Sequence, residues 1–326
     1  METRRPTNPA AEEVLGLYFP VLDHGFVALV DYMGSDEDVE RAARVSYGYG
    51  TRRTSQTRGL IRYLRRHRHT TPSEMVELKF HCAMPMFVAR QWIRHRTASV
   101  NEYSGRYSLL PLLFYRPERA QFSAQSASNR QGRSGAPLDA VYDEAIARWE
   151  RLRRQASDDY EWLVTRDVAR ELARIDLPVS AYTQWYWKVD LHNLLHFLSL
   201  RVDPHAQYEI RAFARVMAGM LQRVAPLSFE AWCDYEFRGT TLSRGELEAV
   251  RRLVRPEDGG LVGSAERVGP EALAALGLSA REIEELLAKL APAPAPEDLT
   301  LDLSAARAAE WFAQRMETAV PRVDRR

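Results

Sequence analysis

Two stretches of the chain carry the apolar patterns of strands. The first runs from Gly25 to Met33 and is largely apolar, and Gly34 follows it. In the second, from Val76 to Cys82, every other residue is apolar and the residues between them are polar or charged. Alternation with period two is typical of a strand with one buried face. A third run, Leu109 to Tyr115, is strand-like, and its Pro111 marks an edge or a break.

Other stretches repeat apolar residues every three or four positions, which predicts helices. Ser35 can cap a helix that has an acidic first turn and runs to about Val45. Pro85 stands where a helix commonly begins, and the apolar side of that helix extends to about Arg96. Further helices are predicted over Leu138 to Gln155, Tyr160 to Arg174, Pro204 to Arg223 and Phe229 to Phe237.

Polar and Gly/Pro-rich stretches separate these elements and divide the chain. Residues 100–107 and 118–137 are predicted loops. Residues 1–22 are expected to be an N-terminal tail, residues 23–238 a core, and residues 239–326 a helical C-terminal extension. Helical pieces are expected in the extension near Ser243 to Val254, Pro270 to Leu290 and Ser304 to Met316. Gly-rich and Pro/Ala-rich linkers separate them.

Composition narrows the class of protein only slightly. The chain has 326 residues, enough for a sizeable core, and a net charge of +1 provides no overall electrostatic steering. Cys82 and Cys233 lie far apart, with neither the spacing of metal ligands nor a disulfide framework, so no metal site is expected. No apolar run is long enough for a membrane helix, and the polar start lacks the apolar core of a signal peptide. A cytoplasmic location without membrane partners is the expectation.

The densest group of ligand-binding side chains lies between Gln91 and Tyr107. It comprises Arg94, His95, Arg96, Ser99, Asn101, Glu102, Ser104 and Arg106. Guanidinium groups stay charged and offer planar forks of donors, so several of them beside hydroxyl and amide groups suit a phosphate or another planar anion. A solvated helix face is the plain alternative for a short Arg-rich stretch.

The spacing in this group resembles the motif of a known family. The pattern R-H-R-x-x-S-x-N-x-x-S-x-R, from Arg94 to Arg106, is similar to that of the flavin-dependent thymidylate synthases, and all seven fixed positions are present. The turn from His69 to Glu74 resembles the second motif of the family. The strings ARIDLP, YTQWYW, LRVDPHAQ and YEIR, between Ala173 and Arg211, resemble its C-terminal motifs. The resemblance covers about Asp23 to Phe237.

The resemblance implies a fold, an assembly and a reaction. The fold would be α+β, with a central, mostly antiparallel sheet and flanking helices. The assembly would be a homotetramer with active sites at subunit interfaces around FAD. The reaction would be reductive methylation of dUMP to dTMP, with the one-carbon unit from 5,10-methylenetetrahydrofolate and electrons from NADPH. Members of the family use no cysteine nucleophile. A typical member is expected to end soon after the region that matches Phe237.

The resemblance also assigns roles to residues. Catalytic roles fall to Arg201, His69 and Ser104. Arg201 would stabilise negative charge on the uracil, Ser104 would position dUMP, and His69 would lie by the flavin ring or the folate. Cofactor-binding roles fall to Thr71, Arg94, His95, Arg96, Ser99, Asn101, Glu102, Asp190, Leu191, His192 and His196. Substrate-binding roles fall to Gln91, Trp92, Ile93, Arg94, Glu102, Tyr103, Ser104, Gly105, Arg106, Arg174 and Arg201.

Three positions depart from the family pattern, and two other functions remain open. Many members have Phe and His in place of Ser73 and Met75, and some have Asn in place of His196. One alternative is a nucleic-acid-binding module that uses the Arg-rich stretch from Thr51 to Thr70. The single aromatic residue of this stretch, Tyr63, does not make the platform of aromatic rings that single-strand binders need, so nucleic acid is not an expected partner. The other is a flavoprotein scaffold without synthase activity.

Overall fold

We describe a computed structural model of the protein, which covers residues 7–45, 57–126, 132–257, 260–263, 268–291 and 297–321. The chain forms two compact units. The first contains residues 1–232 together with residues 299–326, and the second contains residues 233–298. Part of the predicted Arg-rich stretch, including Arg52 and Arg53, lies outside the described residues.

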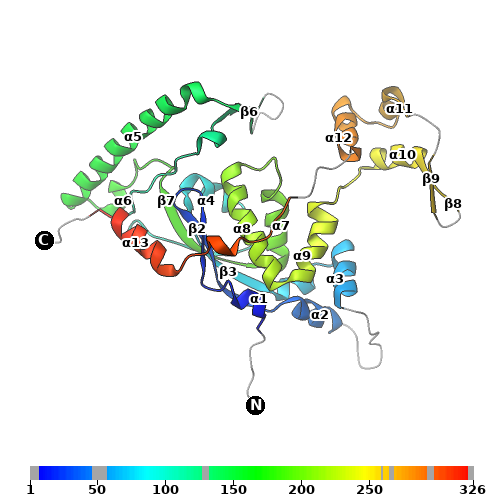
Figure 1. The fold of residues 1–326 in the computed structure, drawn as a ribbon, viewed down its shortest axis with the longest axis horizontal. Helices are drawn as coiled ribbons and strands as arrows, with labels where there is room; N and C mark the ends of the chain where they lie inside the picture. Colours follow the sequence, from blue (N-terminus) through cyan, green and yellow to red (C-terminus); the bar gives the residue numbers. More distant parts are fainter. Residues whose placement is uncertain are drawn as a thin grey trace, which may run out of the picture. The chain divides into compact units, whose positions relative to one another are not determined.

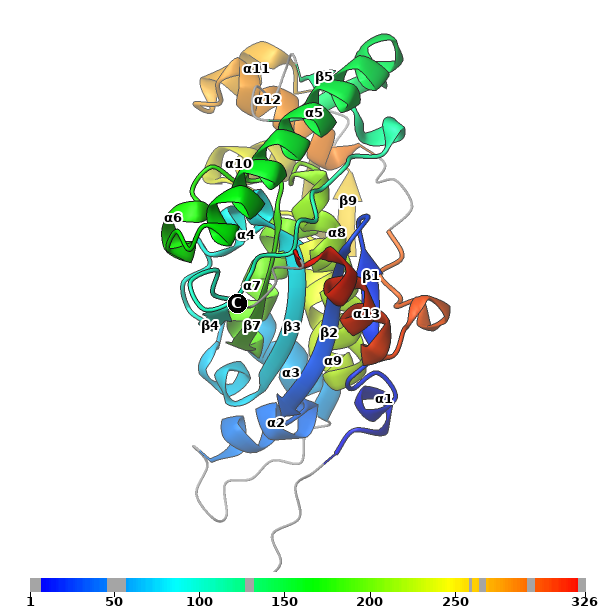
Figure 2. The ribbon, with the colours of Figure 1, turned by 90° about the vertical axis from the view of Figure 1, so that its left-hand side faces the viewer.

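The first unit is built on a five-stranded sheet (Figures 1 and 2). Its strands, in spatial order, are β1 (Tyr18–Val21), β2 (Gly25–Met33), β3 (Glu77–Pro85), β7 (Tyr182–Asp190) and β4 (Ser99–Glu102). Every neighbouring pair is antiparallel. The α+β class with an antiparallel sheet is therefore confirmed, and β2 has the bounds that the sequence predicts.

Helices cover one face of the sheet: α4 (Met86–Trp92), α7 (Leu191–Arg201) and α8 (Tyr208–Val224). Trp185 and Trp187 of β7 point to this face, where both rings contact the ring of Trp92 at 5.4 Å between centroids. Tyr186, between them, points the other way and is 45% exposed. Of the aromatic residues of β7, Tyr182, Trp185 and Trp187 are therefore buried and Tyr186 is exposed. Trp185 and Trp187 share one face because successive side chains of a strand alternate between faces.

The opposite face is covered in part by α13 (Ala309–Ala319), which comes from the end of the chain (Figure 2). Phe312 of α13 lies 4.2 Å from the ring of Phe26, and both join a cluster with Ala28 and Ala83. The backbone of Arg307, just before α13, forms two hydrogen bonds with Tyr18 of β1. The end of the chain therefore belongs to the core unit.

The remaining helices of the first unit surround the sheet. They are α1 (Pro9–Glu12), α2 (Asp36–Arg44), α3 (Thr57–Arg66), α5 (Asp139–Thr165), α6 (Arg170–Ala173) and α9 (Pro226–Trp232), with the 3₁₀ turns η1 (Thr71–Met75) and η2 (Arg119–Gln121). Ser35 and Asp38 form a capping box at the start of α2, as its sequence predicts. After α9, Cys233–Phe237 form a π-helical turn.

Five local predictions are wrong. Residues 99–102 form a strand instead of a loop, α4 ends at Trp92 instead of about Arg96, and residues 109–113 form no strand in the described structure. The predicted loop 118–137 contains the hairpin β5 (Ser123–Gln125) and β6 (Arg133–Pro137). Residues 139–165 form one helix across the expected break after Gln155, where Gln155 donates to Asp159 at 3.0 Å, and this helix ends at Thr165 instead of Arg174.

The second unit contains α10 (Arg244–Leu253), β8 (Val254–Glu257), β9 (Gly260–Gly263), α11 (Pro270–Ala275) and α12 (Ala280–Leu290). Capping boxes begin α10 at Ser243 and α12 at Ser279. The strands β8 and β9 form an antiparallel hairpin where a linker is predicted. The predicted Pro/Ala-rich linker lies largely outside the described residues.

The compact units divide the chain differently from the expected boundaries. Residues 299–321 lie in the core unit, although the sequence groups them with the extension. Residues 18–21, expected in the N-terminal tail, form β1 and pair with β2. These contacts join segments far apart in the sequence, so local composition does not reveal them. Within the described parts of the chain, no helix is both long enough and apolar enough to span a membrane.

Candidate active site

The Arg-His-Arg motif lies in the turn that joins α4 to β4. The backbone N–H of Ile93 donates to Ala89 and ends α4, and the N–H of His95 donates to the carbonyl of Trp92. Arg94 and Arg96 are exposed on this turn, whereas His95 is half-buried against Phe197, with ring centroids 4.9 Å apart. The turn thus presents two guanidinium groups to solvent and directs the imidazole toward the helices.

His95 contacts the arginine that the sequence predicts to be catalytic. Arg201, at the last position of α7, donates from Nε to His95 Nε2 over 3.0 Å. Burial, and then the positive charge of Arg201 and the nearby His196, lower the pKa of His95 to about 4. His95 is therefore neutral at pH 7, with its proton on Nδ1, and it acts as a hydrogen-bond acceptor.

The β4 strand holds the acidic residue of the motif. Its register pairs Asn101 with Tyr186 and Glu102 with Trp185, so the side chain of Glu102 lies on the helical face of the sheet. Thr183 of β7 points to the same face and donates from Oγ1 to Glu102 Oε1 over 2.7 Å. Thr183 is 5% exposed, so its hydroxyl is a fixed donor that orients an otherwise exposed carboxylate.

The loop after β4 carries Ser104, Gly105 and Arg106. Ser104 accepts backbone hydrogen bonds from Tyr107 and Ser108 at its carbonyl, which closes a turn. A Cβ at Gly105 would stand 3.0 Å from Arg174 Cδ, so the absence of a side chain lets Arg174 pack against this turn. Arg106 forms an ion pair of 2.8 Å with Glu171 of α6, and the two side chains are 60% and 50% exposed. We call Ser104, Gly105, Arg106 and Arg174 the loop group.

The junction of β7 and α7 contains three more predicted residues. Asp190 caps α7, because its carboxylate accepts from the backbone N–H of Asn193 at 2.9 Å and from its side chain at 2.7 Å. Leu191 is fully buried and its N–H donates to Val76. His192 Nδ1 is buried and has no hydrogen-bond partner among the residues that the structure describes.

Two predicted residues are too buried for side-chain contact with a ligand in this chain. Trp92 and Leu191 are both 0% exposed, so only their backbone groups can bind one. Gln91 differs, because its buried Oε1 has no hydrogen-bond partner, as is the case for His192 Nδ1. Buried polar atoms are almost always paired in folded proteins, and unpaired ones often mark a ligand site.

The second motif lies at the end of α3 and in η1. His69 and Thr71 are exposed, and the ring of His69 stacks on that of Tyr63, with centroids 6.0 Å apart. The η1 turn packs on α7 and on β7, the elements that carry Arg201 and Thr183. The structure therefore places the second motif beside the helix of the predicted catalytic arginine.

The predicted residues fall into two groups within one chain. The Arg201 group, defined as His95, His196 and Arg201, lies where the chain enters β4, whereas the loop group follows the end of this strand. Three residue steps along β4 correspond to about 10 Å. In the described part of the chain, no hydrogen bond or ion pair joins the side chains of the two groups. Each group is organised separately.

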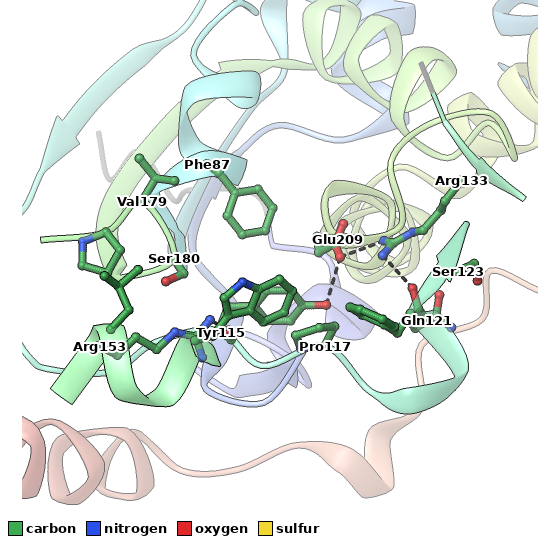
Figure 3. Close-up of a pocket in the computed structure, with 14 residues that line it drawn as sticks. Phe87, Tyr115, Pro117, Gln121, Ser123, Arg133, Arg153, Val179, Ser180 and Glu209 are labelled. Carbon is green, nitrogen blue, oxygen red and sulfur yellow. Dashed lines mark hydrogen bonds and ion pairs between the residues drawn. The ribbon is translucent and has the colours of Figure 1, made fainter. Parts of the chain in front are cut away.

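A cavity of about 450 Å³ lies in the same unit but away from these groups (Figure 3). Its walls are mainly aromatic and apolar, and they include Phe87, Tyr115 and Trp149. Glu209 forms part of the wall, is 2% exposed, and accepts from Tyr115 Oη at 2.9 Å and Arg133 at 2.7 Å. These polar groups satisfy one another, and none of the residues predicted for the site lines the cavity.

Sequence reasoning missed two residues that contact predicted site residues. Thr183 lies in the YTQWYW string, but only the strand register shows that it faces Glu102. Glu171 lies within the helix predicted over Tyr160 to Arg174, and it forms an ion pair with Arg106 in this chain. Both of the cysteines are buried, and burial raises the pKa of Cys82 well above that of an ordinary thiol. This thiol therefore stays protonated at neutral pH.

Comparisons with known proteins place this geometry in a family. Residues 28–227 match the family model described as thymidylate synthase complementing protein. A flavin-dependent thymidylate synthase of Gluconobacter oxydans (strain 621H) is 58% identical over 261 residues, which cover 78% of this chain and 85% of the relative. One of Anaplasma marginale (strain St. Maries) is 48% identical over 298 residues, which cover 90% of this chain and 97% of the relative.

A solved structure is similar as well. It is the crystal structure of the UMP/dUMP methylase PolB from Streptomyces cacaoi bound with 5-Br UMP. It shares 34% sequence identity and a TM-score of 0.61, and the match covers 68% of this chain and 99% of that chain.

The extent of these matches corrects one expectation. Residues 1–237 are less than three quarters of the chain, so a match that covers 90% of it extends past Phe237. The expectation that a family member ends soon after the region matching Phe237 is therefore wrong for the Anaplasma relative. The motifs, the antiparallel fold and the matches over most of the chain together lead to one conclusion: this chain belongs to the family of flavin-dependent thymidylate synthases.

Proposed function

We propose that this protein is a flavin-dependent thymidylate synthase that methylates dUMP to dTMP. The observation that carries the proposal is the hydrogen bond between Arg201 and His95, which holds a guanidinium at a fixed position beside the family motif. The methyl carbon comes from 5,10-methylenetetrahydrofolate, and the electrons come from NADPH. Because the Cys82 thiol is buried and protonated, the ring is activated by polarisation instead of thiolate attack.

The loop group binds the phosphate of dUMP. Arg174 packs against Gly105, so its guanidinium and that of Arg106 have access to the turn formed by Ser104. In this chain Arg106 is neutralised by Glu171, and an exposed pair of this kind is weak enough for a phosphate to compete with it. Ser104 supplies a hydroxyl and positions the nucleotide.

Arg201 polarises the uracil. Burial lowers the pKa of Arg201 but leaves the guanidinium charged at neutral pH. Its Nε is occupied by His95, which leaves the two terminal nitrogens for the negative charge that develops on the ring. A nucleoside monophosphate has its phosphate and its base at opposite ends, which suits two binding groups at opposite ends of β4.

The residues present fit FAD as the cofactor. Arg94 and Arg96 are exposed donors for its phosphates, and the unpaired Gln91 Oε1 and His192 Nδ1 are buried polar atoms that need partners. Thr71, Ser99, Asn101, Glu102 and His196 complete the proposed set. When bound, the flavin supplies the hydride transfer. Thr183 holds the Glu102 carboxylate in one orientation, and Asp190 fixes the start of α7.

A homotetramer is the proposed assembly, with sites at the interfaces between subunits. Large apolar side chains are exposed around the loop group: Tyr107 is 79% exposed, Ile175 70% and Val179 63%. A cluster of such side chains favours an interaction surface. The proposed location is the cytoplasm, where thiols such as those of Cys82 and Cys233 stay reduced.

The visible absorption spectrum of the purified protein tests the proposal. We expect a flavin spectrum that bleaches on anaerobic addition of NADPH and changes when dUMP is added. We then expect dTMP to form when 5,10-methylenetetrahydrofolate is supplied, with a molar mass in solution near that of four chains. A colourless protein that cannot be reconstituted with FAD would refute the proposal. A yellow protein that forms no dTMP would favour the inactive flavoprotein.

A further inference from the structure

The end of α3 carries positive charge that the proposed reaction does not use. On the side of α3 that packs against α9, Arg58 and Arg62 form ion pairs with Glu230 at 2.5 Å and 2.7 Å. Arg66 and Arg68 at the other end are exposed, and their side chains form no hydrogen bond or ion pair in the described part of the chain. The arginines near the start of α3 are therefore paired with an acidic residue, whereas Arg66 and Arg68 at its end have no such pairing in the described part of the chain.

The backbone conformation at Arg68 is costly for an arginine. Arg68 has φ of 58°, and the backbone N–H groups of Arg68 and His69 donate to Arg65 and Leu64. These two bonds are those of a Schellman motif, in which glycine is the usual residue at the left-handed position. A residue with a Cβ is strained there. An arginine held at this position is an outlier of the kind that favours a functional role.

Aromatic rings complete the surface. The Tyr63 ring, 48% exposed, lies 4.4 Å from the ring of His67 and 6.0 Å from that of His69. These contacts hold the rings of His67 and His69 against Tyr63. Along the chain, the two histidines alternate with Arg66 and Arg68. We call Tyr63, Arg66, His67, Arg68 and His69 the α3 patch.

We propose that the α3 patch binds the chain of glutamate carboxylates carried by the reduced-folate co-substrate, an assignment that rests on the proposed function. His69 belongs both to the patch and to the second motif, and Thr71 of the proposed flavin site follows two residues later. A co-substrate whose ring system lies at this motif would have its acidic chain within reach of Arg66 and Arg68. Arg66 and Arg68 would then increase affinity without touching the reacting atoms.

The geometry favours a flexible chain of carboxylates over a compact phosphate. The patch lies at the C-terminal end of a helix, where the exposed carbonyl groups and the helix dipole repel an anion near the backbone. Attraction must therefore come from the guanidinium groups, which extend away from that end. Separate carboxylates along a chain can pair with separate arginines, and each glutamate adds one negative charge.

Binding of the glutamate chain by itself provides a test that does not need turnover. A fluorescently labelled γ-linked glutamate oligomer is titrated with the full-length protein at low salt, and fluorescence anisotropy is measured. We expect binding that weakens with ionic strength, and a loss of about three- to tenfold in the double variant Arg66→Ala/Arg68→Ala. The control is Arg281→Ala, which removes an arginine that is 87% exposed and paired with Glu285 in the second unit. It should bind like the parent protein.

Steady-state kinetics with 5,10-methylenetetrahydrofolate provide a second test. The parent protein should show a lower KM for the form with several glutamates than for the form with one. In Arg66→Ala/Arg68→Ala this preference should disappear, with kcat and the KM for the one-glutamate form unchanged. If the parent protein makes no dTMP from either form, the proposed function fails, and the binding experiment still decides about the patch.

The Arg68→Gly variant separates a structural role from a binding role. Glycine relieves the left-handed strain, so the midpoint of thermal unfolding should rise while binding of the glutamate oligomer falls. Unchanged oligomer binding in both arginine variants would overturn the proposal. Tighter binding of a single-stranded oligonucleotide that is lost in the same variants would also overturn it and indicate a nucleic-acid surface instead.

Discussion

The loop group and the Arg201 group use arginines in different environments. Arg106 is more than half exposed and pairs with a similarly exposed Glu171, so solvent screens the pair and a ligand can displace it. Arg201 is half-buried, and its Nε is held by the neutral His95, which packs on Phe197. The first arrangement suits capture of a phosphate, whereas the second suits a charge that must be at a fixed position when the reaction occurs.

Removal of the Arg201 guanidinium should have the largest effect. In Arg201→Ala we expect dTMP formation to fall by about a hundredfold or more, because the charge that stabilises the uracil anion is lost. Flavin binding should persist, since Arg94 and Arg96 remain. The measurement is dTMP formed per bound flavin, with the flavin spectrum as the control. Turnover that remains near the parent value would remove Arg201 from the chemistry.

Loss of the acceptor on His95 should have the next largest effect. In His95→Phe the ring packing on Phe197 is preserved, but Arg201 loses its partner, so we expect kcat to fall by about tenfold, in line with a hydrogen bond to a charged group. The KM for dUMP should change less, because the loop group is distant. His95→Gln retains an acceptor and should restore part of kcat. Equal rates for the two variants would show that this hydrogen bond does not position Arg201.

Removal of the Thr183 hydroxyl should have a smaller effect on activity. Thr183→Val keeps the shape of the buried side chain and removes the donor to Glu102 Oε1, so we expect kcat/KM to fall by about three- to tenfold. Thr183→Ser keeps the hydroxyl and should be close to the parent protein. The flavin content of both variants should be measured in parallel. A loss of activity in Thr183→Ser as large as in Thr183→Val would indicate a packing defect instead.

The pH dependence of stability should be the smallest effect. The folded-state pKa of His95, about 4, lies below its unfolded value of about 6.5, so the unfolded chain binds a proton first as the pH falls. The stabilising contribution of the neutral His95 to the free energy of unfolding is complete above about pH 6.5, and it is lost as the pH falls toward 4. Because the His95 ring is only half-buried, solvent screening limits the loss of unfolding free energy from this group to about 1 kcal/mol between pH 7 and 5.

Denaturant unfolding at the two pH values measures this contribution. The free energy of unfolding should fall less between pH 7 and 5 in His95→Gln than in the parent protein. Burial also lowers the pKa of His24 and of His81, so part of the pH dependence should remain in the variant. The same pH dependence in both proteins would contradict the assignment of a low pKa to His95.

Local signals in the sequence were sufficient for several elements of this fold. The alternation from Val76 to Cys82 predicts β3, and Ser35 with its acidic first turn predicts α2. Such signals depend on side chains close in sequence, so they survive without knowledge of the fold. The β4 strand gave no such signal, because all four of its residues are exposed and its pairing depends on the edge of β7.

In the candidate site, too, some features follow from the local sequence and others depend on the fold. The motif alone identified the residue types and their order, because the family resemblance depends on spacing along the chain. The resemblance assigns His95 to the cofactor-binding residues, and the structure adds that its ring accepts a hydrogen bond from Arg201 and that burial lowers its pKa to about 4. Charge at a histidine depends on burial and on its neighbours, which the sequence does not contain.

By itself, then, the sequence determined the family and the main strands and helices, and it led to the proposed set of site residues. The tertiary structure decided how these side chains are held: Thr183 against Glu102, His95 against Arg201, and Phe312 of the last helix against Phe26 of the second strand. Each of these contacts joins residues more than 80 positions apart, with Thr183 and Glu102 separated by 81. Strand register and helix packing bring such residues together, because they bury apolar surface over the whole unit.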